Sequence, residues 1–145
     1  MSTVLDEVTS ETINAAHVRR RVKDWEGRLN DLYAAIGDWL PDGWNTRQGA
    51  PVMMHEELMR KYGVAAKRIP TLELLGLSGE IVKVEPRALW IIGANGQVDL
   101  KRDGHRYLIV DMAENFERPD WQVAHAERRC DRETVTREWL RRVLQ

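Results

Sequence analysis

Residues 4–40, VLDEVTSETINAAHVRRRVKDWEGRLNDLYAAIGDWL, carry the strongest pattern in this sequence. Their apolar side chains recur at alternating spacings of four and three residues, the repeat of a helix that buries one stripe. Glu11 is the only polar member of this stripe, which contains Val4, Val8, Glu11, Ala15, Val18, Val22, Trp25, Leu29, Leu32, Ile36 and Trp39. Pro41, Asp42 and Gly43 follow, and they end the helix because proline cannot continue it and glycine favours a turn.

The length of this stripe leaves two interpretations of the helix. An unbroken helix over residues 4–40 measures roughly 55 Å, whereas a compact domain of this size has a radius of gyration of roughly 15 Å. Such a helix would project from the domain or pair with a second long helix. In the alternative, the helix breaks at Thr9–Ser10, and Ser10 caps a shorter helix that starts at Glu11.

The apolar stripe also leaves open what it packs against. It predicts either an intermolecular helix pair or a helix that covers a sheet of its own chain. The flanking charges do not specify a parallel homodimer, since Arg21 and Glu26 make one favourable pair but Arg28 faces Tyr33. We define the seam as the six central residues of the stripe and predict it as an interaction surface. The seam consists of Val18, Val22, Trp25, Leu29, Leu32 and Ile36.

Trp44 is added to this predicted interaction surface because it lies in a polar loop, and tryptophan is enriched at interface hot spots. Burial of Trp44 beneath its own loop is the alternative. Either arrangement keeps the polar segment 41–51 outside the regular elements.

From Gly79 onward the apolar period changes to two, which is typical of strands. Strands are predicted at 81–85, 89–92, 97–101 and 107–112, with a short fifth strand at 121–124. The turn signals Gly93–Gly96 and Arg102–His105 separate them, so residues 79–124 predict an antiparallel meander.

Helices are predicted at about 52–62 and in the last residues, 133–145. The order of helices, strands and a helix predicts one α+β domain spanning residues 1–145, with residues 1–70 mainly helical, a meander of four or five strands and a C-terminal helix.

Composition excludes several classes of protein. The 145 residues contain 22 Lys and Arg against 23 Asp and Glu, a net charge of −1, which argues against a nucleic-acid coat protein or a polybasic membrane binder. No stretch approaches about 18 consecutive apolar residues, and residues 1–12 lack the regions of a signal peptide. Cys130 is the only cysteine, which excludes an internal disulfide framework. We expect a cytoplasmic protein without a membrane contact.

Two acidic residues on neighbouring predicted strands, Asp99 and Asp111, offer a different function. The arrangement resembles metal-dependent nucleases of the PD-(D/E)xK type, in which carboxylates hold Mg²⁺ and a lysine helps to activate water. Ala113 stands two residues after Asp111, where the lysine would be. In a rival register Lys101 follows Asp99 at that spacing, with Glu85 as the upstream acid. Neither register is complete.

Basic residues gather near the C-terminus and on the long helix. Six arginines and three acids lie between Arg128 and Arg142, and Arg19–Arg21 with Lys23 form a second cluster. These clusters could touch an acidic protein or a phosphate backbone, with Arg128, Arg129 and Arg132 as the candidate contacts to nucleic acid, although exposed helix faces are often this basic without binding anything.

The sequence therefore predicts a small, non-catalytic, bacterial-type protein–protein interaction module, such as an adaptor, an immunity-type protein or an assembly subunit. Its partner is another protein or a second copy of the chain, bound through the helix, and no metal or cofactor is expected. The alternative is a metal-dependent nuclease, or a degenerate relative of one, that uses Asp99, Asp111 and Lys101 with Mg²⁺.

Overall fold

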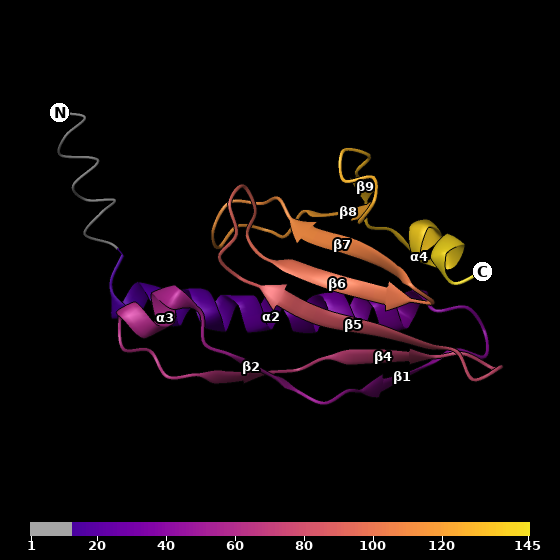
Figure 1. The fold of residues 1–145 in the computed structure, drawn as a ribbon, viewed down its shortest axis with the longest axis horizontal. Coiled ribbons are helices and arrows are strands. Elements are labelled where there is room, and N and C mark those ends of the chain that lie inside the picture. Colours follow the sequence, from indigo (N-terminus) through magenta and orange to yellow (C-terminus); the bar gives the residue numbers. More distant parts are fainter. Residues whose placement is uncertain (1–12) are drawn as a thin grey trace.

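A computed structural model describes residues 13–145 of the protein. One long helix lies across a large antiparallel sheet, and short elements flank the two ends (Figure 1). The elements are α2 (Ala15–Trp39), β1 (Asn45–Gln48), β2 (Val52–Met54), α3 (Glu57–Lys61), β3 (Lys67–Ile69), β4 (Leu72–Leu75), β5 (Ile81–Ala88), β6 (Gln97–Arg102), β7 (His105–Asp111), β8 (Trp121–His125), β9 (Glu133–Thr134) and α4 (Arg137–Val143). The predicted α+β class is confirmed.

Helix α2 follows a polar capping residue and ends shortly before a proline. Its N-cap is Asn14, whose side-chain oxygen accepts a hydrogen bond from the backbone N–H of His17 at 3.0 Å. The helix ends at Trp39, two residues before Pro41, as the sequence predicts. The predicted break at Thr9–Ser10 lies outside the described residues. Of the helices in residues 13–145, none combines the length and apolar character needed to cross a bilayer.

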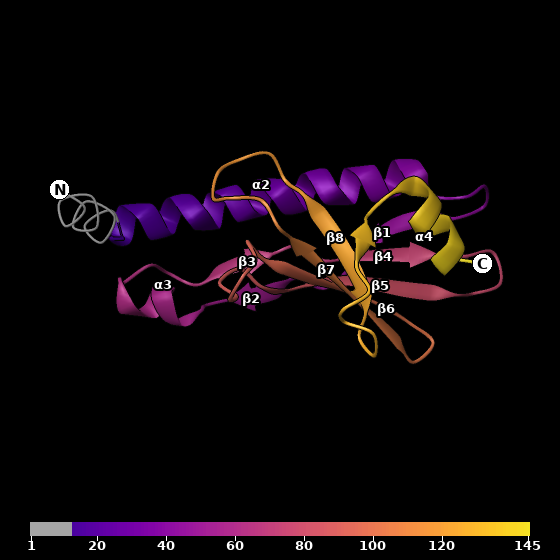
Figure 2. The ribbon, with the colours of Figure 1, turned by 90° about the horizontal axis from the view of Figure 1, so that it is seen from above.

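The large sheet contains more strands than the four or five predicted. Its order is β1-β4-β5-β6-β7-β8-β9, all antiparallel, and β2 and β3 form a separate two-stranded sheet. Val84 pairs with Leu100 and Val98 pairs with Ile109, which aligns these side chains on one face of the sheet. This is the inner face, which α2 covers, and the opposite side is the outer face (Figure 2).

The seam forms the centre of the hydrophobic core. Leu29 and Ile36 have no exposed surface, and no seam residue is more than 4% exposed. Burial of each such side chain stabilises the fold by roughly 1.5–3 kcal/mol. Of the two open interpretations, the structure shows the helix that packs on the chain's own sheet. The prediction that the seam is an interaction surface is corrected accordingly, because in this fold these six residues are not accessible to a partner.

Residues 45–69 differ from the mainly helical region that the sequence predicts. The predicted helix at 52–62 is instead strand β2 followed by the short helix α3. The chain is extended at Glu56, where φ is −75° and ψ is 164°, and the Glu56 carboxylate accepts hydrogen bonds from a distant loop. Pairing of β2 with β3 and this long-range contact override the local helical pattern.

Strand β5 also differs from the prediction. It continues through Pro86 to Ala88, and a register shift between these residues accommodates the proline. The predicted strand at 89–92 is not formed, because residues 89–96 make an irregular loop with one isolated bridge between Ile91 and Ala94.

The C-terminal helix is shorter than predicted. Glu133–Thr134 form the edge strand β9, and Thr136 caps α4 by accepting a hydrogen bond from the N–H of Trp139 at 3.1 Å. Helix α4 lies beside the C-terminal end of α2, where Arg141 donates a hydrogen bond to the Trp39 carbonyl at 3.0 Å (Figure 2).

Candidate functional site

Loop 89–96 presents an exposed apolar residue at its tip. Leu89 is buried at the base, Trp90 and Ile91 are half-buried, and Ile92 is fully exposed. Gly93 follows with a φ of +81°, which turns the chain back toward β6. A single exposed isoleucine is ordinary on a protein surface. Whether this loop is a candidate site therefore depends on how it is held.

The first end of the loop is fixed by one carboxylate. Glu56 accepts hydrogen bonds from the backbone N–H groups of Leu89 at 2.8 Å and Trp90 at 3.1 Å. Hydrogen bonds to a charged acceptor are stronger than those between neutral groups. Glu56 therefore fastens the loop to the segment that enters α3.

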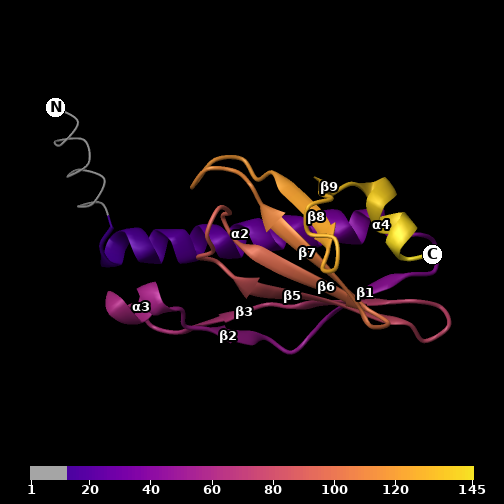
Figure 3. The same ribbon diagram turned by 45° about the horizontal axis from the view of Figure 1, so that its top comes forward.

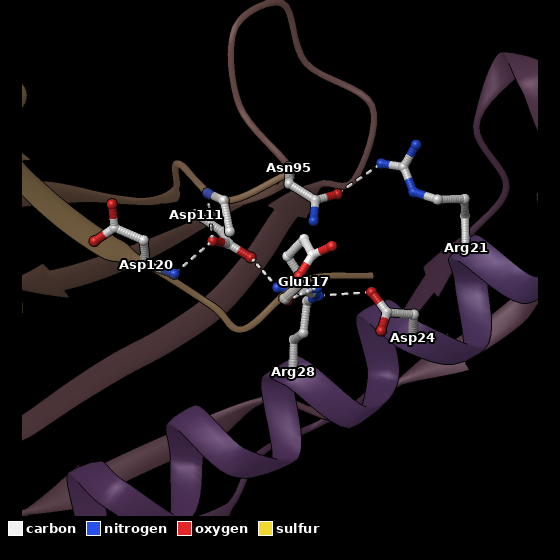
Figure 4. Close-up of polar contacts among 8 residues, drawn as sticks. Arg21, Asp24, Arg28, Asn95, Asp111, Glu117 and Asp120 are labelled. Carbon is white, nitrogen blue, oxygen red and sulfur yellow. Dashed lines mark hydrogen bonds and ion pairs between the residues drawn. The ribbon is translucent and has the colours of Figure 1, made fainter. Parts of the chain in front are cut away.

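The second end of the loop is fixed by Asn95, which is 2% exposed. Its backbone N–H donates to the carbonyl of Asp111 at 2.7 Å, and the Asp111 N–H donates to the carbonyl of Gly96 at 3.1 Å. The Asn95 side-chain oxygen accepts a hydrogen bond from Arg21 of α2 at 2.7 Å, as Figure 4 shows. Both ends of the loop are thus held by polar contacts, which are partly buried at Glu56 and buried at Asn95.

Gly96 brings this second end directly against the helix. Its φ is +111°, and a Cβ placed there would lie 2.3 Å from a ring carbon of Trp25. No side chain fits at this position without displacing a buried indole. The close approach of loop and helix therefore requires glycine.

Arg28 anchors the neighbouring loop, residues 112–120. Its guanidinium, 4% exposed, forms ion pairs of 2.6 Å with Asp24 and 2.6 Å with Asp111. It also donates to the backbone carbonyl of Glu117 (Figure 4). All three contacts fall on one buried cation, so its charge is well compensated.

The carboxylate of Asp111 is equally well satisfied. One oxygen binds Arg28, and the other accepts hydrogen bonds from the N–H groups of Ala113 at 3.0 Å and Asp120 at 2.8 Å. The side chain has no exposed surface. This geometry assigns Asp111 an anchoring role for loop 112–120.

Arg21 is satisfied less completely. Its side chain is buried, and burial, the largest cause, lowers the pKa of its guanidinium. The guanidinium lies 5.6 Å from the ring of Trp90. Within residues 13–145, its Nε and the Asn95 Nδ2 are buried without a hydrogen-bond partner. Arg21 forms no ion pair with any described residue.

Aromatic and cationic side chains continue this flank of α2. Phe116 has a φ of +65°, a left-handed conformation that bulky residues rarely adopt. The Arg20 guanidinium lies 3.8 Å from the centre of its ring, and the His17 ring meets it edge-on at 5.9 Å. Partial burial, followed by the charges of Arg21 and Arg20, lowers the pKa of His17.

The two acids of the nuclease alternative lie on opposite faces of the sheet. Asp99 pairs with Leu108, three residues before Asp111, and successive side chains alternate between faces. Asp99 is on the outer face, where it accepts hydrogen bonds from Gln97 at 2.9 Å and Arg106 at 3.4 Å. The structure therefore does not bring Asp99 and Asp111 together, and the pair cannot share one metal ion in this arrangement.

The rival register is brought together on the outer face. Glu85 lies directly opposite Asp99, and the Lys101 ammonium is 3.4 Å from the Glu85 carboxylate. Two carboxylates and a lysine therefore meet there, although Asp99 is buried and turned toward Arg106. The described residues contain no group of three or more His, Cys, Asp or Glu side chains that could hold a metal ion.

The remaining predicted contact residues, Trp44 and three arginines, are not part of loop 89–96. Trp44 is half-buried and packs against the core, with its ring 3.1 Å from the position of a Cβ on Gly76, so only part of the side chain is presented to solvent. Arg128, Arg129 and Arg132 are exposed in the connection between β8 and β9.

Comparison of the chain with models of protein families, with curated proteins and with solved structures finds no match. The candidate site therefore depends on geometry alone. Sequence reasoning missed Glu56, Asn95 and Ile92, and it placed Arg21 in a basic surface cluster, whereas the structure buries this side chain. The available signal was the run of apolar residues directly before the turn at 93–96. A run of that composition is expected in a buried strand, so its presence in a loop with an exposed tip is unusual.

Proposed function

We propose that the protein is a protein-binding module and that loop 89–96 is its contact surface. The observation that carries this proposal is the full exposure of Ile92 at the tip of a loop held at both ends by polar contacts, buried at Asn95 and partly buried at Glu56. The buried seam has no part in it.

The rigid attachment of the loop supports a binding role. A loop that is already ordered loses little conformational entropy on association, so more of its contact energy appears as affinity. Trp90 lies two residues before Ile92 in the loop, and the Arg21 guanidinium is 5.6 Å from its ring. Tryptophan and arginine are enriched in interface hot spots. An isoleucine projecting from this base is suited to fill an apolar pocket of a partner protein.

The test compares two exposed apolar positions in the full-length chain. Ile92→Asp places a charge at the tip of the loop, and Leu77→Asp makes the same change at the turn between β4 and β5, where Leu77 is 81% exposed. Tagged wild type and both variants are isolated from the native host, and bound proteins are quantified by mass spectrometry.

We expect Ile92→Asp to lose a stoichiometric partner that wild type and Leu77→Asp retain, by about tenfold or more for a hot-spot residue. Light scattering of the purified chains separates a foreign partner from a second copy of the chain. Equal recovery of the same proteins by both variants, with the same mass in solution, would contradict the proposal.

A further inference from the structure

A groove of about 670 Å³ lies on the opposite flank of α2 from Arg21 and Arg28. One wall is a helix face formed by Arg19, Lys23 and Glu26, which follow at spacings of four and three residues. The other wall is the segment 64–68, whose last two residues belong to β3. We name this feature the basic groove.

The charges of the basic groove are unbalanced. Arg19, Lys23, Lys67 and Arg68 contribute four cations, whereas Glu26 is the only acid among the lining residues that belong to the described range 13–145. Glu26 is 3.6 Å from Lys67. The other three cations form no ion pair with any residue in 13–145, so the groove carries an excess of positive charge.

The bottom and one side of the groove suit an extended chain. Val22 and Val64 are buried and form an apolar floor, while Ala65 and Ala66 are small and exposed. Among the described residues β3 has β2 as its only strand neighbour, and Figure 3 shows β3 on the α2 side of β2. An unpaired strand edge accepts the backbone of an added strand.

We propose that the basic groove binds an extended acidic segment of a partner protein, which pairs with the edge of β3 and places its carboxylates against Arg19, Lys23 and Arg68. Main-chain hydrogen bonds supply affinity in this mode of binding, and the flanking cations select acidic side chains. Nucleic acid fits less well, because Glu26 repels phosphate and no aromatic side chain lines the groove to stack on bases.

This inference goes beyond the proposed function, since the basic groove and loop 89–96 flank opposite sides of α2. A partner that touches one surface need not touch the other. The two proposals therefore fail independently, and Ile92→Asp serves as a variant that leaves the groove unchanged.

The test measures binding of fluorescent peptides to the full-length chain by anisotropy. The probe is an eight-residue peptide that alternates glutamate and valine, and its matched control carries lysine in place of glutamate. A third peptide keeps the glutamates but has N-methyl groups on all its backbone nitrogens, which blocks strand pairing along both of its edges. An oligothymidylate of ten nucleotides represents nucleic acid.

We expect the glutamate peptide to bind and to weaken as salt is raised, whereas the lysine and N-methyl peptides bind at least about tenfold more weakly. Arg19→Glu combined with Lys23→Glu should lower affinity for the glutamate peptide by about tenfold or more. Arg118→Glu combined with Lys83→Glu changes net charge equally at exposed positions away from the groove, and it should bind as wild type does.

Circular dichroism establishes that both double variants are folded. The proposal is overturned if the glutamate peptide does not bind, if the two double variants bind it equally, if N-methylation has no effect, or if oligothymidylate binds more tightly than the peptide.

Discussion

Two buried arginines on one helix, Arg28 and Arg21, lie two turns apart and have different surroundings. Arg28 meets two carboxylates and a carbonyl, all within residues 13–145. Arg21 meets one amide oxygen and keeps a buried Nε without a partner there. The first arginine fastens loop 112–120, and the second touches loop 89–96.

This difference distinguishes an arginine that stabilises the fold from one that lies beside the proposed contact surface. A fully compensated cation stabilises one arrangement of its neighbours, whereas a buried cation with unmet hydrogen-bonding capacity is costly for the isolated fold. Cost of this kind is typical of functional positions. The comparison therefore assigns Arg28 a structural role. Arg21 is the buried arginine that lies nearest the proposed contact surface.

Arg28→Met should show the largest loss of stability. It leaves the carboxylate of Asp111 buried without its cation, which costs about 3–5 kcal/mol. Urea unfolding followed by circular dichroism measures this free energy, and Arg118→Met, at an exposed arginine, should stay within about 0.5 kcal/mol of wild type. If the two variants unfold alike, the anchoring role of Arg28 is wrong.

Gly96→Ala should show the next largest effect, because its Cβ would meet the ring of Trp25 and φ is positive. We expect a loss of about 2–3 kcal/mol in unfolding free energy. Gly93→Ala, with a positive φ but open space, should cost about 1 kcal/mol. Equal losses at both glycines would mean that the close packing of loop and helix is unimportant.

Arg21→Met should cost about 1 kcal/mol or less, because the lost hydrogen bond to Asn95 is offset by removal of a poorly compensated buried charge. The same urea titration measures it beside Arg28→Met. A loss as large as that of Arg28→Met would remove the contrast between the two arginines.

His17→Gln should show the smallest effect, visible only in its pH dependence. Burial and neighbouring arginines lower the pKa of folded His17, so the unfolded chain binds more protons as pH falls through about 6.5. Wild type therefore loses stability as the pH decreases through this window, and the variant should lose less. Thermal melts at several pH values give the dependence of stability on pH for both proteins. Parallel curves for wild type and His17→Gln would contradict the prediction.

The stripe on residues 15–39 was predicted correctly as a helix because its period repeats over many turns, and its end follows from Pro41. The meander was predicted because Val98, Leu100 and their neighbours alternate. What failed depends on pairing between distant segments, since 52–54 reads locally as helix but pairs with 67–69.

The candidate site was beyond prediction for the same reason. Arg21 and Asn95 are 74 residues apart in sequence, and Glu56 is 33 residues from Leu89. No local sequence pattern predicts contacts between residues so far apart. Asp99 and Asp111 show the converse, because their presence on neighbouring strands was predicted but the parity of the register, which puts them on opposite faces, was not.

The packing of α2 has a consequence for synthesis of the chain. The strand residue that pairs with Arg28 follows it by 83 positions, so the ribosome completes the helix long before its cover exists. At about 5–20 residues per second, the apolar stripe waits roughly 4 to 17 seconds for the last central strands. During that interval the apolar stripe of the nascent chain lacks its intramolecular cover, and exposed apolar surface of this kind is prone to aggregation.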